Sequence, residues 1–167
     1  MILFETMRLY VRQWESGDLD QIYLLYGDPA VMQYIRAPLT LDETRHILSA
    51  HLEGYREKPF LGRFAVIEKH SDAFIGTFLL KESETITGIE IGYAFLERCW
   101  GKGYATELVE RGVIFAFEKH SIKELYAITE SYNEASRKVL RKCGFKQLDN
   151  IFELGSEVNL FFRERLE

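Results

Sequence analysis

At 167 residues the chain has the length of one domain, and we expect a single core across residues 1–167. Its 47% hydrophobic and 14% aromatic residues, with charges mixed along the sequence, exclude a disordered or fibrous protein. The formal net charge of -5 argues weakly against a duplex-binding surface and is compatible with a cationic small substrate, so we expect no nucleic-acid partner.

The N-terminal stretch and the cysteines bear on where the protein works. Glu5 and Arg8 interrupt the region where a signal peptide needs a continuous apolar run, and no run approaches the roughly 18 apolar residues of a membrane span. The only two cysteines, Cys99 and Cys143, cannot form a disulfide framework and have no metal ligands beside them. We therefore expect a cytoplasmic protein with reduced cysteines, no membrane partner and no metal.

The first half of the chain predicts a strand, two helices with a short segment between them, and a hairpin. Ser16 or Asp18 offers a helix start before an apolar run that ends near Gly27. Thr40 and Glu43 have the spacing of a capping box at the start of the second helix. In chain order we expect a strand over 7–14, a helix ending near 27, an irregular or short helical segment over 30–37, a helix over 41–55, and hairpin strands over 62–69 and 73–81.

The second half predicts a strand, a glycine-rich bend and a helix, followed by another strand, another helix and a hairpin. Gly112, on the apolar face of the first of these helices, indicates close packing there, and Asn133 and Gly144 bound the second helix. The expected elements are a strand over 87–96, helices over 103–119 and 133–143, a strand over 123–130, and a closing hairpin from 145–155 and 156–166.

The bend at Gly101 and Gly103 has the arrangement of an anion site, because it follows a strand and opens a helix. A helix N-terminus offers unpaired N–H groups and a partial positive charge, and glycines let the backbone approach a diphosphate closely. A plain tight turn is the simpler alternative. A Walker loop is excluded because Tyr104 follows Gly103, whereas a Rossmann fingerprint fits poorly because Thr106 stands at its third glycine and Glu124 precedes the next strand.

Two stretches, "GIEIGYAFLERCWGKGYATELV" and "NEASRKVLRKCGFKQ", resemble the GNAT superfamily of acetyl-CoA-dependent N-acetyltransferases. The opening "FETMRLYVRQWESGDLDQIYLLYGDPAVMQYI" is similar to its RimJ/RimL-like branch, which acetylates ribosomal-protein N-termini. The resemblance implies an α/β (mixed α+β) fold with a mostly antiparallel twisted sheet flanked by helices, and acetyl-CoA held at a splayed strand and a helix N-terminus. The signature Q/R-x-x-G-x-G/A is matched by Arg98, Cys99, Trp100, Gly101, Lys102 and Gly103.

The same resemblance implies roles for residues around the bend and on the last helix. The bend, with Tyr104 and Ala105, would hold the CoA pyrophosphate, and the strand edge at Phe95 and Leu96 would pair with the pantetheine amides. Asn133 would anchor the cofactor, and Ser136 would face the leaving sulfur. The tyrosine that many superfamily members carry later on this helix is absent from "RKVLRKCG", which favours Ser136 as the acid.

An attacking amine must be neutral, so the reaction needs a base or a water chain. Resemblance to Rim-type enzymes makes Glu90 the candidate, with Glu130 in reserve, and the alternative is an ion-paired or solvent-facing strand glutamate. His46 and His51 have the wrong spacing for a helical metal pair. Tyr34 and Arg36 fall in the proline-flanked segment that could border the acceptor cleft, and neither is expected to be catalytic.

The function predicted is transfer of acetyl from acetyl-CoA to a primary amine by direct attack in a ternary complex. The acceptor stays open among a peptide N-terminus, a polyamine, an aminoglycoside and an amino-acid-like amine. A non-catalytic CoA-binding regulatory module is the alternative from another class, and a dinucleotide-binding protein is a weaker one. Exposed strand or helix surfaces could also support a homodimer.

Overall fold

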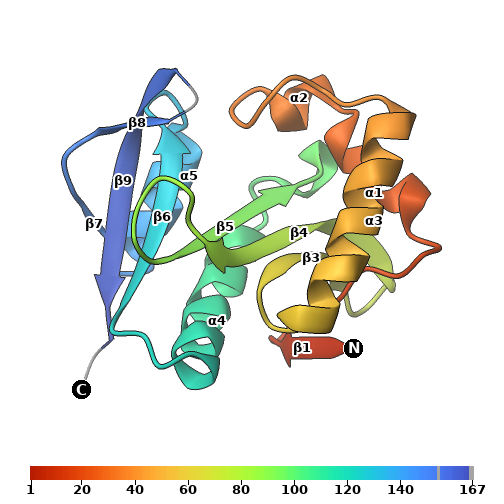
Figure 1. The fold of residues 1–167 in the computed structure, drawn as a ribbon, viewed down its shortest axis with the longest axis horizontal. Helices are drawn as coiled ribbons and strands as arrows, with labels where there is room; N and C mark the ends of the chain where they lie inside the picture. Colours follow the sequence, from red (N-terminus) through yellow and green to blue (C-terminus); the bar gives the residue numbers. More distant parts are fainter. Residues whose placement is uncertain (154, 166–167) are drawn as a thin grey trace.

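The strands form one twisted, mostly antiparallel sheet in the computed structural model, which describes residues 1–153 and 155–165 (Figure 1). Within those residues the strand order is β1-β2-β3-β4-β5-β6-β9-β7, and β8 pairs with β9. Only β5 and β6 run parallel. The strands are β1 Ile2–Glu5, β2 Leu9–Arg12, β3 Gly62–Glu68, β4 Ala73–Glu82, β5 Ile89–Phe95, β6 Glu124–Glu130, β7 Lys146–Gln147, β8 Ile151–Glu153 and β9 Ser156–Glu164.

Five α-helices and a 3₁₀ turn in the described residues complete the mixed α/β fold that was predicted. The capping box at Thr40 and Glu43 is present, and the Asn133 side chain accepts the N–H of Ser136 at the start of the last helix. These helix starts were therefore predicted correctly from sequence. The elements are α1 Leu19–Tyr26, α2 Pro29–Met32, α3 Leu41–Glu57, the 3₁₀ turn Glu97–Cys99, α4 Tyr104–Lys119 and α5 Glu134–Lys142.

Two sequence predictions about strands need correction or refinement. The single strand expected over 7–14 is the second arm of a hairpin, because β1 precedes it and pairs with it antiparallel. The closing hairpin is present as β8 and β9, with β7 as an additional short strand on β9. Leu154 and Leu166, which fell within the predicted hairpin, lie outside the described residues.

The sheet opens between β5 and β6. The two strands pair only at Ile89 with Leu125 and at Glu90 with Tyr126, and beyond these pairs they diverge, as Figure 1 shows. The edge of β5 after Glu90 that faces β6 therefore lacks a neighbouring strand. Such an edge leaves backbone donors and acceptors available to an extended ligand.

The two faces of the sheet carry different helices. A Cβ at Gly112 of α4 would lie 2.6 Å from Phe78, which shows how closely α4 approaches the face that bears Phe78 and Ile91. On the opposite face Arg63 of β3 lies over Tyr26 of α1, with 6.0 Å from its guanidinium carbon to the ring centroid. Since successive strand residues alternate between faces, Glu90 and Gly92 share the face of Arg63, whereas Ile91 and Tyr93 share the face of α4.

Within residues 1–153 and 155–165, no helix is both long and apolar enough to cross a membrane. The free cysteines Cys99 and Cys143 are both buried.

Candidate active site

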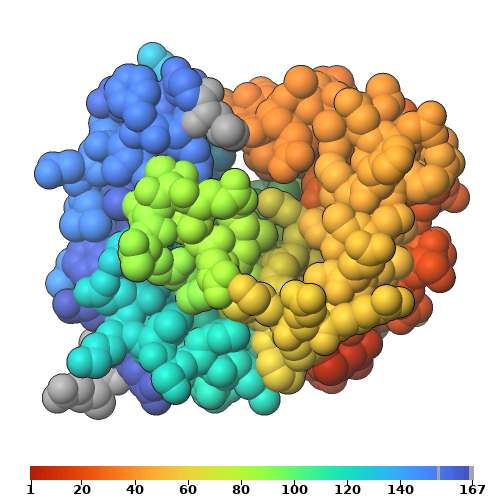
Figure 2. All heavy atoms as spheres, in the orientation of Figure 1, coloured from red at the N-terminus to blue at the C-terminus, as the bar shows by residue number. Residues whose placement is uncertain are grey.

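A cavity of about 970 Å³ passes through the opening between β5 and β6. Its walls come from the segment after α2, from β3 to β6, from the glycine bend, and from the first turns of α4 and α5. Figure 2 shows the surface hollowed between the orange segment around α2, the green β4–β5 loop and the blue C-terminal strands. Both faces of the sheet thus contribute side chains to one continuous space.

The bend has the geometry of an anion cradle. Gly101 and Gly103 adopt φ values of 72° and 79°, in the left-handed region that favours glycine. Glu107 N–H makes the first helical bond of α4, to the Gly103 carbonyl at 3.2 Å, so the preceding amides of this turn have no helical acceptor. Gly101 and Gly103, together with Tyr104, Ala105 and Thr106, line the cavity. Unpaired amides, a helix dipole and the lack of a side chain at the bend fit a pyrophosphate.

Arg8 of the N-terminal hairpin braces this bend, a role that sequence reasoning missed. Its Nη1 donates to the Lys102 carbonyl at 2.9 Å, and its Nε donates to Glu107 Oε2 at 2.7 Å. The guanidinium also lies 4.5 Å from the centre of the Tyr104 ring. Burial raises the pKa of Glu107, but hydrogen bonds from Thr6 and Arg8 outweigh it and hold that pKa below its usual value. A contact spanning about a hundred residues leaves no signal in local sequence.

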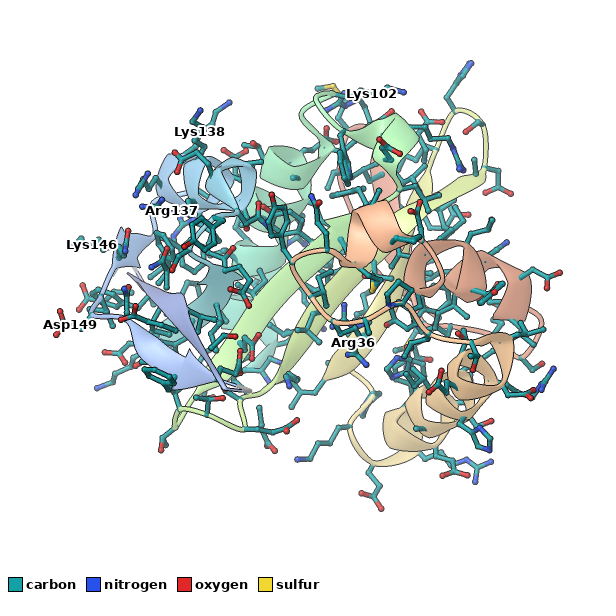
Figure 3. All side chains as sticks on the ribbon, turned by 90° about the horizontal axis from the view of Figure 1, so that it is seen from above. Arg36, Lys102, Arg137, Lys138, Lys146 and Asp149 are labelled. Carbon is teal, nitrogen blue, oxygen red and sulfur yellow. The ribbon has the colours of Figure 1, made fainter. Side chains whose placement is uncertain are left out.

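The other residues predicted to bind the cofactor lie around the bend, and only some of them line the cavity. Leu96 is buried and its N–H donates to the Ile75 carbonyl, while the Trp100 indole donates to the Phe95 carbonyl at 2.8 Å. Phe95, Cys99 and Trp100 contribute to the cavity wall. Leu96 and, within the signature, Arg98 and Lys102 do not line the cavity. Lys102 projects outward in Figure 3, and Arg98 is exposed with one nitrogen 3.3 Å from the Phe74 carbonyl.

Ser136 lies beside a tyrosine from another element. The Tyr93 hydroxyl donates to Ser136 Oγ at 3.3 Å, and the Ser136 N–H is held by Asn133 Oδ1 at 3.1 Å. All three residues line the cavity. Burial raises the pKa of Tyr93 to about 12. Tyr93, within "EIGYAF" on β5, thus places a hydroxyl beside Ser136 that the sequence analysis did not single out.

Glu90 projects from the other face of β5 into the same cavity. Burial raises its pKa, a nearby Glu153 adds to the rise, and Lys81 and Arg63 oppose it. No ion pair within 4.0 Å involves Glu90 in the part of the chain that the structure describes. Glu90 is thus a partly buried carboxylate with a raised pKa and no ion pair within 4.0 Å among the described residues.

Several other predicted residues also reach the cavity. Glu130, at the end of β6, lines it, as do Tyr34 and Arg36 from the segment after α2. His46 and His51 belong to no cluster of three or more potential metal ligands in residues 1–153 and 155–165. The polar side chains that line the cavity are thus carboxylates, arginines, hydroxyls and the amides of Gln33 and Asn133.

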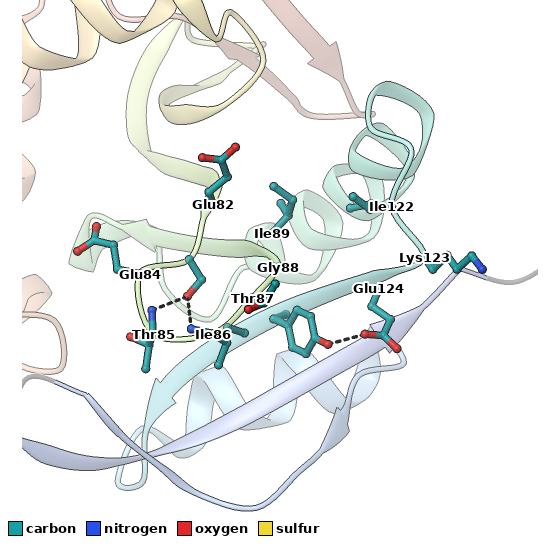
Figure 4. A pocket seen from close by; sticks show the side chains of 12 residues that line it. Glu82, Glu84, Thr85, Ile86, Thr87, Gly88, Ile89, Ile122, Lys123 and Glu124 are labelled. Atoms are coloured by element: carbon teal, nitrogen blue, oxygen red, sulfur yellow. Dashed lines mark hydrogen bonds between the residues drawn. The ribbon is translucent and has the colours of Figure 1, made fainter.

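A second hollow, of about 820 Å³, lies at the β4–β5 loop and the start of β6 (Figure 4). The Ser83 hydroxyl there accepts the N–H groups of Thr85 and Ile86, which fixes the loop, and the Tyr126 hydroxyl donates to Glu124. None of the predicted site residues lines this open hollow.

A family model described as an acetyltransferase (GNAT) domain matches residues 8–146 of the chain. The chain belongs to the GNAT acetyltransferase family. An N-acetyltransferase of Bacillus licheniformis called p20, itself uncharacterized, is 31% identical over 149 residues, which are 85% of this chain and 81% of that protein. This GNAT chain is therefore an acetyl-CoA-dependent N-acetyltransferase that acts on amines.

Solved structures share its fold at low sequence identity. RimL, the ribosomal L7/L12 α-N-protein acetyltransferase in complex with CoA, superposes with a TM-score of 0.82 and 17% identity, over 98% of both chains. Spermidine N-acetyltransferase from Vibrio cholerae, in complex with CoA and spermine, gives a TM-score of 0.77 and 22% identity, over 94% of this chain and 95% of that chain. The GNAT fold predicted from the motif is thereby confirmed.

Proposed function

We propose that residues 1–167 form a single GNAT domain that acetylates a primary amine by direct attack on acetyl-CoA within a ternary complex. The observation that supports this most strongly is the single cavity reached by Glu90 from one face of the sheet and by Ser136 and the glycine bend from the other. A base on one side of the β5–β6 opening and a thioester on the other would meet at the opening. Acetyl-CoA, when bound, supplies the activated acyl group.

In this proposal Glu90 takes a proton from the ammonium form of the acceptor, since only the neutral amine has a lone pair. The amine nitrogen then bonds to the acyl carbon, and the carbon–sulfur bond breaks with its electrons on sulfur. The nitrogen loses its second proton to leave the neutral amide, and that proton neutralises the CoA thiolate. Ser136 and Tyr93 would hydrogen-bond the sulfur as it becomes negative. Because the pKa of Tyr93 is about 12, well above the roughly 8.5 of an ordinary thiol, Tyr93 suits hydrogen-bond donation better than full loss of its proton.

Cofactor binding would use the bend and its surroundings. Gly101 to Ala105 and the first-turn amides of α4 would hold the pyrophosphate, with Arg98 and Lys102 adding positive charge outside the cavity. The free edge of β5 between Glu90 and Phe95 would pair with pantetheine; Leu96, predicted to share this role, instead donates its N–H to the Ile75 carbonyl. Asn133 would anchor the cofactor beside Ser136. The CoA complexes of the two structural relatives support acetyl-CoA as co-substrate.

The proposed class of acceptor, primary amines, is inferred from the relatives of this chain. The RimL structure favours a peptide N-terminus, and the spermidine acetyltransferase favours a polyamine. Cytoplasmic location, supported by two free buried cysteines, and homodimer formation are also proposals.

The test separates this enzyme from a CoA-binding regulatory module. Glu90→Gln and Ser136→Ala should each lower turnover about 100-fold while leaving the affinity for CoA, measured by calorimetry, within about twofold of the wild type. Unchanged turnover in both variants would remove the assigned mechanism, and absence of turnover in the wild type with tight CoA binding would favour the module.

A further inference from the structure

The acceptor end of the cavity contains two arginines from distant parts of the chain. Arg36 comes from the segment after α2, and Arg63 comes from the start of β3. Their guanidinium carbons lie 5.9 and 6.0 Å from the ring centroid of Tyr26, so both converge on one aromatic side chain. Figure 3 shows Arg36 lying between its own loop and the strands of the sheet.

Neither Arg36 nor Arg63 forms an ion pair with a carboxylate, within 4.0 Å, in the part of the chain that the structure describes. The Arg63 side chain makes one long hydrogen bond, from Nη1 to Thr77 Oγ1 at 3.4 Å. Two guanidinium groups that line one cavity, neither in an ion pair with another described residue, are suited to bind an anion from outside the chain.

The pKa of His51 on α3 is affected by the same two positive charges. Burial, together with the charges of Arg63 and Arg36, lowers this pKa to about 4. His51 therefore stays neutral at physiological pH and neither adds to nor cancels the charge of the arginines. The positive field at this end of the cavity comes from Arg36 and Arg63.

The cavity is also lined by carboxylates. Glu90, Glu130 and Glu153, from β5, β6 and β8, all line it. Arg63 and Glu90 lie on the same face of the sheet, on strands two apart and offset by two residues along the strand, which places their backbones about 12 Å from each other at the usual strand spacing and rise. Leu79 of β4 lies between Arg63 and Gly92 of β5 on this face, and both Leu79 and Gly92 line the cavity. The space between the two charges suits a short molecule.

Building on the proposed function, we propose that the acceptor is a zwitterion: a primary amine that carries its own carboxylate or phosphate a few bonds from the nitrogen, with the anion on Arg36 and Arg63 and the amine at Glu90. A bidentate guanidinium contact fits either anion. A polyamine would place positive charge against both arginines, which is unfavourable. Amino acids and amino-sugar phosphates are the two sources of this chemistry.

Matched substrate pairs test the proposal. Each amino acid is compared with its carboxamide, and an amino-sugar phosphate is compared with the free amino sugar, with spermidine as a polycation. Each rate is divided by the concentration of substrate whose amine is neutral at the assay pH. This correction is needed because converting the carboxylate to a carboxamide changes the pKa of the amine. We expect kcat/KM at least tenfold higher for the anionic member of one pair, and the pair that shows this preference distinguishes carboxylate from phosphate.

Variants assign the preference to the arginines. Arg63→Gln and Arg36→Gln should each collapse the ratio of kcat/KM between the anionic and uncharged members toward one, mainly through KM, and Arg63→Lys should keep part of it. Arg56→Gln, at an exposed arginine near the end of α3, is the matched control and should keep the ratio. Equal use of both members by the wild type, a preference for spermidine, or an unchanged ratio in both Gln variants would overturn the zwitterion proposal.

Binding measurements test this inference separately from the proposed reaction. Calorimetric titration of each pair into the CoA-bound protein needs no turnover. Tighter binding of the anionic member, lost in Arg63→Gln but without acetylated product, would support the anion site and overturn the proposed acetylation of these amines. Acetylation of an uncharged amine with equal binding of both members would uphold the reaction and overturn the inference.

Discussion

At the scale of single residues, Glu90 combines burial with a place in the cavity, and this combination has a cost in stability. Its pKa in the folded chain is raised, so at pH values between the unfolded and folded pKa the folded chain binds more protons than the unfolded chain. Stability falls as the pH rises through this window, and the loss persists at higher pH. Neutral glutamine carries no such penalty.

Glu90→Gln is therefore expected to melt at a higher temperature than the wild type at pH 7. The difference in melting temperature should shrink as the pH falls below the usual glutamate pKa, since both side chains are then neutral. Scanning calorimetry from pH 4 to pH 8 measures it. A lower melting temperature for the variant at pH 7 would show that the charged carboxylate stabilises the fold, contrary to the burial argument.

The pairing of Tyr93 with Ser136 gives a second prediction. If both hydroxyls stabilise the leaving sulfur, Tyr93→Phe and Ser136→Ala each slow turnover, and the double variant is less impaired than the product of the two effects, because the hydroxyls share one hydrogen bond. Steady-state rates of the wild type, the two single variants and the double variant complete this double-mutant cycle. Strict multiplicativity would mean that the two hydroxyls act independently.

At the scale of elements, the N-terminal hairpin and the start of α4 are joined through Arg8. Arg8→Ala removes bonds to the Lys102 carbonyl and to Glu107, which position the bend and first turn. We expect KM for acetyl-CoA to rise about tenfold, equivalent to about 1.4 kcal/mol, with a much smaller change in kcat. Arg45→Ala, which breaks an exposed pair with Asp42 on α3, is the control and should leave KM unchanged.

Helix α4 depends on a glycine for its distance from the sheet. Gly112→Ala would place a Cβ 2.6 Å from Phe78 and 3.3 Å from Ile91, so overpacking should destabilise the fold by about 1–3 kcal/mol. Gly54→Ala on α3 meets nothing within 4 Å and should instead stabilise by about 0.5–1 kcal/mol. Urea denaturation compares the two variants. Equal effects of the two substitutions would contradict the packing argument.

At the scale of the whole molecule, local patterns predicted most elements because their causes are local. The capping box at Thr40, the Asn133 cap and the alternation along β5 each act over a few residues, and each is present in the structure. The glycine bend was also located correctly, since positive φ is a property of the residue itself.

Long-range features could not be predicted in the same way. The pairing of β1 with β2, the brace from Arg8 to Glu107 and the meeting of Tyr93 with Ser136 depend on how the chain returns on itself. The two unpaired arginines also come together only through the fold, because Arg36 and Arg63 are carried by separate elements. One sequence contains the residues of the site, but their distances follow from the sheet topology.

The most direct test of the account measures thiol release from acetyl-CoA together with the mass of the acceptor, for the wild type and Glu90→Gln, with amines from each class. The account predicts one acetylated amine per thiol released by the wild type, and a rate about 100-fold lower for the variant across neutral pH. Equal rates for the two proteins, or thiol release without an acetylated amine, would contradict it.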